Sequence, residues 1–223
     1  MTTRSDIGVL IAALGDEEID KQEQAISDLV QIGPDAVGPL INAIHDGDAR
    51  VCANAADALG LIGDSRAVGA LIVALQDSES AVVLAAITAL RRIGDPMAVP
   101  ALMEFLSEED ISLHFHATHA LAQIRHPDTV HALLEKIRTN DTNVLHGCIV
   151  ALGRLGDRAA IQPLIPLLQS SEEKIRYSTV YALGDLATGD DQNVIVALRP
   201  LLEDPVPNVR DATQEALAKL ELG

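Results

Sequence analysis

The sequence predicts an all-α protein, a continuous stack of about seven short helix pairs. Two observations lead to this fold class. A segment such as Ala58-Leu59-Gly60-Leu61-Ile62-Gly63 recurs along the chain, and its apolar markers follow at regular intervals of 31 residues: Ile62, Ile93, Ile124, Leu155 and Leu186. The 223 residues are 48% hydrophobic but only 2% aromatic, without Trp. A core of Ala, Leu, Ile and Val favours closely packed helices.

One period contains two helices. The spacing of Val68, Leu71, Ile72 and Leu75 is helical, and so is the spacing of Val82, Ala86, Leu90 and Ile93 after a break at Asp77-Ser78. Between the periods stand residues that begin and end helices. Asp64, Asp95 and Asp157 can cap the following helix, with Pro96 at its first position, whereas Gly33, Gly63, Gly94 and Gly156 suit a left-handed helix end.

A single pair of this kind cannot bury its own apolar face, so neighbouring pairs must stack. We therefore expect one domain over 1–223, with approximate repeats 5–33, 34–63, 64–94, 95–125, 126–156, 157–188 and 189–222. Two places depart from the pattern: Arg125-His126 replaces the Gly-Asp turn, and Thr188-Gly189-Asp190 adds residues. We expect a local change of curvature at both.

Composition excludes several classes of function. With 16 Lys and Arg against 33 Asp and Glu, the net charge of −17 repels nucleic acid. No segment has the pattern of a signal peptide or of a membrane span, so neither a membrane nor nucleic acid is an expected partner and a cytoplasmic location is predicted. Cys52 and Cys148 lie three repeats apart, too far for a disulfide, which fits a reducing compartment.

The repeat resembles a known family. The pairs Ile175-Arg176 with Ala182-Leu183-Gly184 and Val209-Arg210 with Ala216-Leu217 are similar to the HEAT-like repeats of phycobilisome (bilin) lyases. This resemblance implies a right-handed α-solenoid whose second helices line a concave side. It also implies that Arg176 and Arg210 join neighbouring repeats through acidic partners. Other repeats have Cys52, Val83, His114 and Leu145 there, so we expect the arginine contacts to be missing through the middle.

The second helices carry a variable stripe beside their apolar core positions. Residues equivalent to Asn54, Asp57 and Leu61 are spaced i, i+3, i+7, and their chemistry changes between repeats. A column free of packing demands is expected to meet a partner. With a flanking column, the candidate concave binding residues are Thr88, Arg92, Phe115, His116, His119, Gln123, His146, Val150, Arg154, Tyr177, Tyr181 and Asp185. The alternative is packing against a neighbouring helix, above all for Phe115 and Tyr177.

Histidines raise the question of a metal. His116 and His119 share a helix face and His146 follows one repeat later, but no carboxylate lies nearby in these columns. Histidines exposed in a binding groove are the favoured interpretation, and a site formed by these three is the alternative. The adjacent pairs Phe115-His116 and His146-Gly147 are not the His-Glu pairs of the related enzyme deoxyhypusine hydroxylase, and no other catalytic motif is present.

The sequence thus predicts a non-enzymatic adaptor, without a cofactor, whose concave surface binds a protein or peptide through aromatic and Arg side chains. One alternative is a bilin lyase or phycobilisome-associated chaperone that binds a tetrapyrrole or a phycobiliprotein, with Arg92 or Arg154 meeting the propionates. A metal-binding accessory protein that uses the histidines is another.

Overall fold

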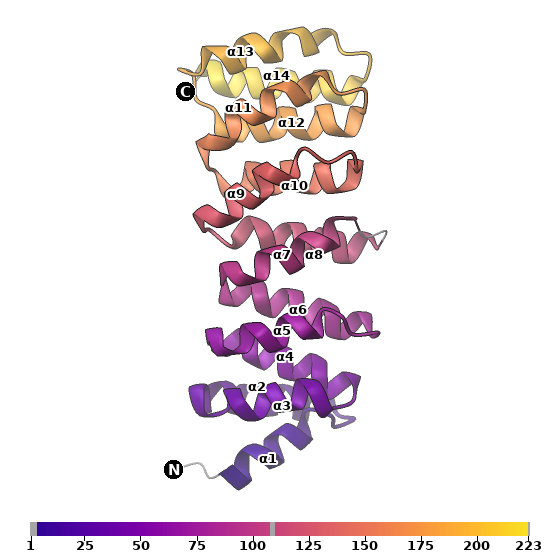
Figure 1. The fold of residues 1–223 in the computed structure, drawn as a ribbon, viewed down its shortest axis with the longest axis vertical. Helices are drawn as coiled ribbons and strands as arrows, with labels where there is room; N and C mark the ends of the chain where they lie inside the picture. Colours follow the sequence, from indigo (N-terminus) through magenta and orange to yellow (C-terminus); the bar gives the residue numbers. More distant parts are fainter. Residues whose placement is uncertain (1–3, 108–109, 223) are drawn as a thin grey trace. The chain divides into compact units, whose positions relative to one another are not determined.

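Helix follows helix throughout the computed structural model of this chain, which describes residues 4–107 and 110–222 (Figure 1). These described residues form fourteen α-helices, linked and extended by short 3-10 turns, and contain no β-strand. The contacts divide the chain into two units, Met1–Leu102 and Met103–Gly223.

The helices occur in seven consecutive pairs, which confirms the predicted repeat. In the first unit the pairs are α1 (Arg4–Ala13) with α2 (Ile19–Ile32), α3 (Val37–Asp46) with α4 (Ala49–Ile62), and α5 (Val68–Ala74) with α6 (Ser80–Ile93). Helix α7 (Val99–Glu104) runs across the boundary and precedes α8 (Ile111–Gln123). The other pairs are α9 (Pro127–Lys136) with α10 (Thr142–Leu155), α11 (Ile161–Leu164) with α12 (Glu173–Leu186), and α13 (Gln192–Leu198) with α14 (Pro207–Leu222).

The predicted caps form at the starts of the repeats. Asp64, Asp95 and Asp157 each accept a hydrogen bond from the backbone N–H two residues later, over 2.9, 2.9 and 2.8 Å. Each cap begins a 3-10 turn that leads into the first helix of the pair. Gly33, Gly63, Gly94 and Gly156 follow second helices with φ of 70–77°, a region that favours glycine over residues with a β-carbon.

The turn at Arg125-His126 has its own geometry. Helix α8 ends on Ile124 with φ −77° and ψ 82°, instead of on a left-handed glycine. His126 replaces the aspartate cap, and its Nδ1 accepts from the Asp128 N–H over 3.3 Å. The chain therefore enters α9 directly at Pro127, without a preceding 3-10 turn. The change of curvature expected at this turn stays a prediction.

The second helices pack directly on one another within each unit: α2, α4 and α6 in the first, and α8, α10, α12 and α14 in the second. Their core is made of leucines without solvent exposure, such as Leu59, Leu90, Leu121 and Leu152. Three glycines allow a close approach, because a β-carbon on Gly60, Gly153 or Gly184 would lie 2.6–3.0 Å from an alanine of the next second helix. This contact gives a physical reason for the Ala-Leu-Gly motif.

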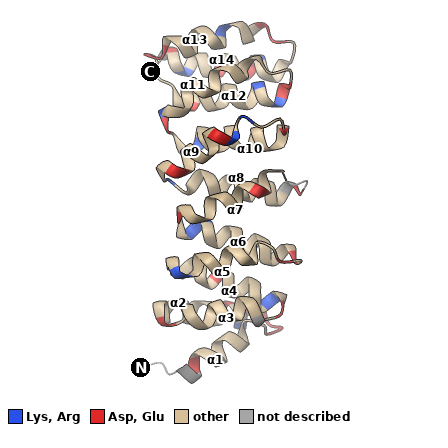
Figure 2. Ribbon diagram, viewed as in Figure 1, with Lys and Arg blue, Asp and Glu red and all other residues tan. Residues whose placement is uncertain are grey.

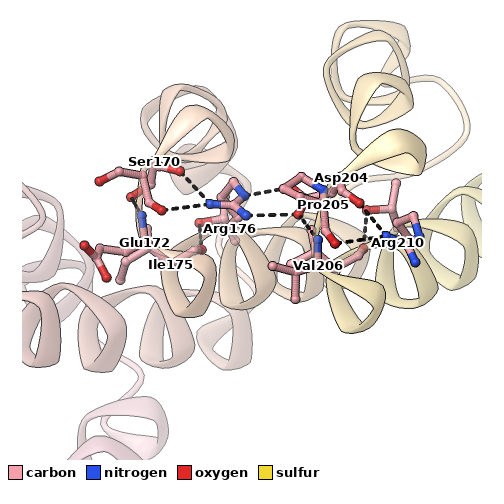
Figure 3. Close-up of polar contacts among 12 residues, drawn as sticks. Ser170, Glu172, Ile175, Arg176, Asp204, Pro205, Val206 and Arg210 are labelled. Atoms are coloured by element: carbon pink, nitrogen blue, oxygen red, sulfur yellow. Dashed lines mark hydrogen bonds and ion pairs between the residues drawn. The ribbon is translucent and has the colours of Figure 1, made fainter.

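Of the two arginine contacts predicted between repeats, the one made by Arg176 is present, whereas Arg210 contacts backbone carbonyls of its own repeat (Figure 3). Arg176 of α12 binds Asp204 through Nε and Nη2, over 2.7 and 2.9 Å, and its Nη1 donates to the Ser170 carbonyl over 2.9 Å. Arg210 of α14 donates to the Asp204 carbonyl over 2.6 Å. Arg176 therefore joins α12 to the turn that precedes α14.

Earlier repeats lack these arginines, and two of the residues that replace them contact backbone carbonyls instead. The Cys52 thiol donates to the Ile44 carbonyl over 3.1 Å. His114 Nδ1 lies 3.0 Å from the Leu106 carbonyl oxygen. Both residues thus satisfy carbonyls at the end of the preceding helix, as Arg176 and Arg210 do. What is lost at Cys52 and His114 is the carboxylate partner, since a thiol or an imidazole is too short to reach one in the next repeat.

Candidate functional site

Helices α8, α10 and α12 bring nine of the twelve predicted residues together in the second unit; six of them are exposed, and His119, His146 and Val150 are half-buried. We call this the second-helix surface and define it by these nine residues: Phe115, His119, Gln123, His146, Val150, Arg154, Tyr177, Tyr181 and Asp185. Phe115 is 55% exposed, Tyr177 38% and Tyr181 41%. Phe115 therefore keeps an exposed ring, whereas Tyr177 also lines a pocket with Val206 and Val209 of the next repeat.

One column of the predicted stripe does not belong to this surface. Ala85, Gly147, Ser178 and Ala212 are buried. A β-carbon on Gly147 would lie 2.8 Å from the Leu106 side chain and 3.3 Å from that of His114. His116, a predicted binding residue in the same column, is half-buried, and its Nδ1 lies 2.7 Å from the Ser112 carbonyl oxygen of its own helix. The expectation that this column faces a partner is corrected: it packs between helices.

Two predicted residues, Thr88 and Arg92, lie on α6 in the first unit. Thr88 is half-buried. Arg92 reaches back to α4, where its Nη1 lies 3.3 Å from Oδ1 of Asp57. Burial raises the pKa of Asp57, and the guanidinium of Arg92 opposes that rise. Arg92 therefore pairs within its own unit.

A pocket of about 300 Å³ lies over α10 and α12. Six predicted residues line it, namely His146, Val150, Arg154, Tyr177, Tyr181 and Asp185. Its lining also includes Gly153 and Ala182, the pair at which the two helices approach closely. The Tyr177 and Tyr181 rings meet edge to face with centroids 4.9 Å apart. We call this the tyrosine pocket.

Tyr181 is held from two sides. Its hydroxyl lies 3.5 Å from Oε2 of Glu215 on α14. A hydrogen bond with Tyr177, burial and the charge of Glu215 raise the pKa of Tyr181 to about 12. The phenol therefore stays neutral at physiological pH, and its ring remains an apolar surface with one polar end.

A second pocket, of about 440 Å³, lies beside the first and is lined by His119, Ala122, Gln123, Arg125 and Arg154. Arg154 lines both pockets. Its Nη1 lies 3.2 Å from Nδ1 of His119. The Gln123 side-chain amide lies 3.0 Å from the other ring nitrogen, Nε2. We call this the arginine pocket. Sequence reasoning missed Arg125 as a site residue, although its replacement of the turn glycine was a visible signal.

Acidic and basic residues occur on helices of both units (Figure 2). On the second-helix surface, Asp185 of α12 binds Lys219 of α14, with Nζ and Oδ1 2.8 Å apart. Both side chains are well exposed, so this ion pair adds little to stability. Together with Tyr181 and Glu215, it ties the exposed sides of α12 and α14. Asp185 therefore already has a basic partner within the chain.

The histidines do not converge. His146 stacks on His114 with ring centroids 6.2 Å apart and planes inclined by 6°, whereas His119 stacks near Phe115 at 6.3 Å. Burial, with the charges of Lys174 and His114, lowers the pKa of His146 to about 4. Within 4–107 and 110–222, no three His, Cys, Asp or Glu side chains are grouped so that they could hold a metal ion. The alternative site of His116, His119 and His146 is therefore not formed.

The two cysteines are free and buried. Burial raises the pKa of Cys148 to about 12, and burial also raises the pKa of Cys52. Since the thiolate is the nucleophilic form, both side chains act as small core residues. Among the helices that the structure describes, none is long and apolar enough to cross a membrane.

Comparisons with solved structures find similar folds. Importin beta matches with a TM-score of 0.69 and 15% identity over 97% of this chain and 35% of its own. An archaeal HEAT-like repeats protein from Thermococcus onnurineus NA1 matches with a TM-score of 0.64 and 14% identity over 97% of both chains. The complex of CpcE and CpcF of phycocyanin lyase from Nostoc sp. PCC7120 has a TM-score of 0.49 and 21% identity, covering 96% of this chain and 94% of the matched chain.

No curated protein sequence matches the chain significantly. The family model for HEAT repeats, however, matches residues 7–90, 69–145, 99–184 and 130–218. These overlapping matches cover nearly all of the seven helix pairs. The chain therefore belongs to the HEAT-repeat family.

Proposed function

We propose that this chain is a non-enzymatic adaptor that binds a segment of another protein on the second-helix surface. The observation that carries the proposal is the exposure of Phe115, Tyr177 and Tyr181, the last two of which line the tyrosine pocket. The chain is only 2% aromatic, and three of its four Phe and Tyr residues are these exposed ones. Most of its aromatic rings therefore contribute little to the core. Exposed apolar groupings of this kind mark interaction sites.

The chemistry of the surface suits a protein segment. Tyr rings bury a large apolar area at a small cost in conformational entropy and keep a polar end, and they are enriched among residues that dominate binding energy. The tyrosine pocket is bounded by small residues, Gly153 and Ala182. A volume of about 300 Å³ is at the lower end of the range for ligand pockets and suits one large side chain of a partner.

Electrostatics supports protein over nucleic acid as the partner class. A net charge of −17 repels a polyanion, and long-range attraction to a phosphate backbone is absent. Near the tyrosine pocket, Asp185 is compensated by Lys219. Binding there is expected to depend on shape and apolar contact, with little dependence on bulk charge.

A photo-crosslinking experiment in the native cell tests the proposal. A benzophenone amino acid replaces Phe115 in one variant and Val196 in another. Val196 is 64% exposed and lies on the first helix of its pair, away from the second-helix surface. We expect a discrete crosslinked partner at position 115 and none at position 196. A partner crosslinked from position 196 alone would place the interaction on the first helices instead.

A further inference from the structure

The arginine pocket contains two guanidinium groups and no carboxylate. Its lining is His119, Ala122, Gln123, Arg125 and Arg154. The chain has 33 acidic residues against 16 basic ones, so a pocket with this composition departs from the charge balance of the whole molecule. Guanidinium groups bind oxyanions through their N–H donors.

Neither arginine is neutralised within the described part of the chain. Arg154 contacts His119 Nδ1, and no carboxylate lies within ion-pair distance of Arg154 or Arg125 among residues 4–107 and 110–222. The equivalent Arg92 of α6, by contrast, pairs with Asp57. His119 of α8 occupies the position equivalent to Asp57. Its imidazole accepts a hydrogen bond from Arg154 but supplies no negative charge. The change from Asp57 to His119 therefore leaves the charge of Arg154 uncompensated.

The turn after α8 changes the charge in the same direction. Arg125 stands where other repeats have Gly33, Gly63, Gly94 or Gly156, and His126 stands where three of them have an aspartate. A cation is thus added to the lining of the same pocket, and an anion is removed from the next position along the turn. The absence of the left-handed glycine leaves Ile124 with ψ 82°, and the exposed Arg125 lines the pocket.

We propose that the arginine pocket binds an oxyanion, a carboxylate or a phosphate group, between Arg125 and Arg154. A guanidinium matches both groups in geometry, because its N–H donors form paired hydrogen bonds with two oxygens. His119 holds the Arg154 guanidinium in place by accepting one of its N–H groups. A volume of about 440 Å³ accommodates the anion together with the first atoms of its carrier.

Arg154 also lines the tyrosine pocket, so one partner segment can occupy both. Such a segment carries an oxyanion next to a large apolar side chain. This assignment of the anion to the partner rests on the proposed function, whereas the anion site itself does not.

NMR titration of the full chain with sodium phosphate, sodium acetate and sodium chloride at matched ionic strength tests the site without a partner. We expect phosphate to shift the Arg125 and Arg154 Nε–Hε signals and the His119 ring signals, with saturation at millimolar concentration. Arg125→Gln and Arg154→Gln should each weaken apparent binding about tenfold, because a charge-assisted hydrogen bond is lost. Arg199→Gln removes the same charge from an exposed position and should change nothing.

The outcomes are distinct. Equal shifts with chloride, or binding that survives in both Arg125→Gln and Arg154→Gln, would overturn the proposal. Saturation with acetate as well as phosphate identifies a carboxylate as sufficient, and saturation with phosphate alone identifies a phosphate group; both results support an oxyanion site. A saturable site together with no crosslink at Phe115 would leave this site intact and contradict the proposed function.

Discussion

A β-carbon on Gly60 of α4 would lie 2.6 Å from the Cα atom of Ala89 of α6. Real β-carbons do not approach backbone atoms so closely, so the two helices are in contact only because position 60 is glycine. Gly153 and Ala182 repeat this relationship in the second unit, at 3.0 Å. The second-helix surface is built on these contacts, since the same pair of residues lines the tyrosine pocket.

Gly60→Ala should therefore destabilise the protein. The added methyl group forces α4 and α6 apart, at a cost of about 1–3 kcal/mol, which exceeds the gain of about 1 kcal/mol from better helix propensity. Gly69→Ala in α5 is the matched control, because a β-carbon there meets nothing within 4 Å. Chemical denaturation should show a lower free energy of unfolding for Gly60→Ala and an equal or higher one for Gly69→Ala. Equal stabilisation by both would contradict the close approach.

Arg176→Leu should be far more damaging than removal of an exposed ion pair. Arg176 and Asp204 have side chains 12% and 5% exposed, so the substitution leaves a buried carboxylate without its cation. We expect a loss of about 3–5 kcal/mol. Lys219→Leu removes the partner of the exposed Asp185 and should cost less than about 1 kcal/mol. Similar losses from the two variants in denaturation curves would be inconsistent with this account.

The Arg176–Asp204 pair also predicts that the stability of the fold depends on pH in acid. The hydrogen bonds from Arg176 hold the pKa of Asp204 below its usual value. A carboxylate whose folded pKa is lowered stabilises the fold above its unfolded pKa, about 3.9, and this contribution is lost as pH falls through the folded pKa. Unfolding measured from pH 5 to pH 2 should therefore show a steeper loss of stability in the wild type than in Asp204→Asn. Parallel curves would show that Asp204 does not contribute.

His146 predicts a second pH dependence, at milder acidity. Its pKa is lowered from 6.5 to about 4 in the folded chain, so the unfolded state binds more protons between these values. Stability should fall as pH drops from about 6.5 to about 4, by about 2 kcal/mol between pH 7.5 and pH 5, or less where water screens the ring. His146→Phe keeps a ring against His114 and should reduce this slope. An unchanged slope in the variant would assign the effect to other groups.

The fold was accessible from the sequence because each signal is repeated. Asp64 as a cap or Gly63 as a helix end is weak evidence alone, but the same residues recur at Asp95 and Gly94 in a constant spacing. The candidate surface was accessible for a related reason: comparison of equivalent positions separated the uniform core column of Leu59 from columns whose chemistry varies.

The distances between helices could not be predicted by comparing the repeats. Periodicity assigned Ser178 and Gly147 to an exposed stripe, but the angle and closeness of α8, α10 and α12 bury them. Arg125 was noticed only as an irregular turn, because a residue outside the helical columns has no place in a face-by-face comparison. That it shares a pocket with Arg154 follows from where the chain leaves α8, which only the three-dimensional structure supplies.

The central claim is that a partner binds through the tyrosine pocket. Isothermal titration of the partner crosslinked at position 115 against the wild type, Tyr181→Ala and Val196→Ala tests it most directly. Truncation of a central aromatic residue typically costs about 2 kcal/mol or more, which is about a 30-fold loss of affinity. We predict that loss for Tyr181→Ala with an unchanged melting temperature, and wild-type affinity for Val196→Ala. Wild-type affinity in Tyr181→Ala would contradict the claim.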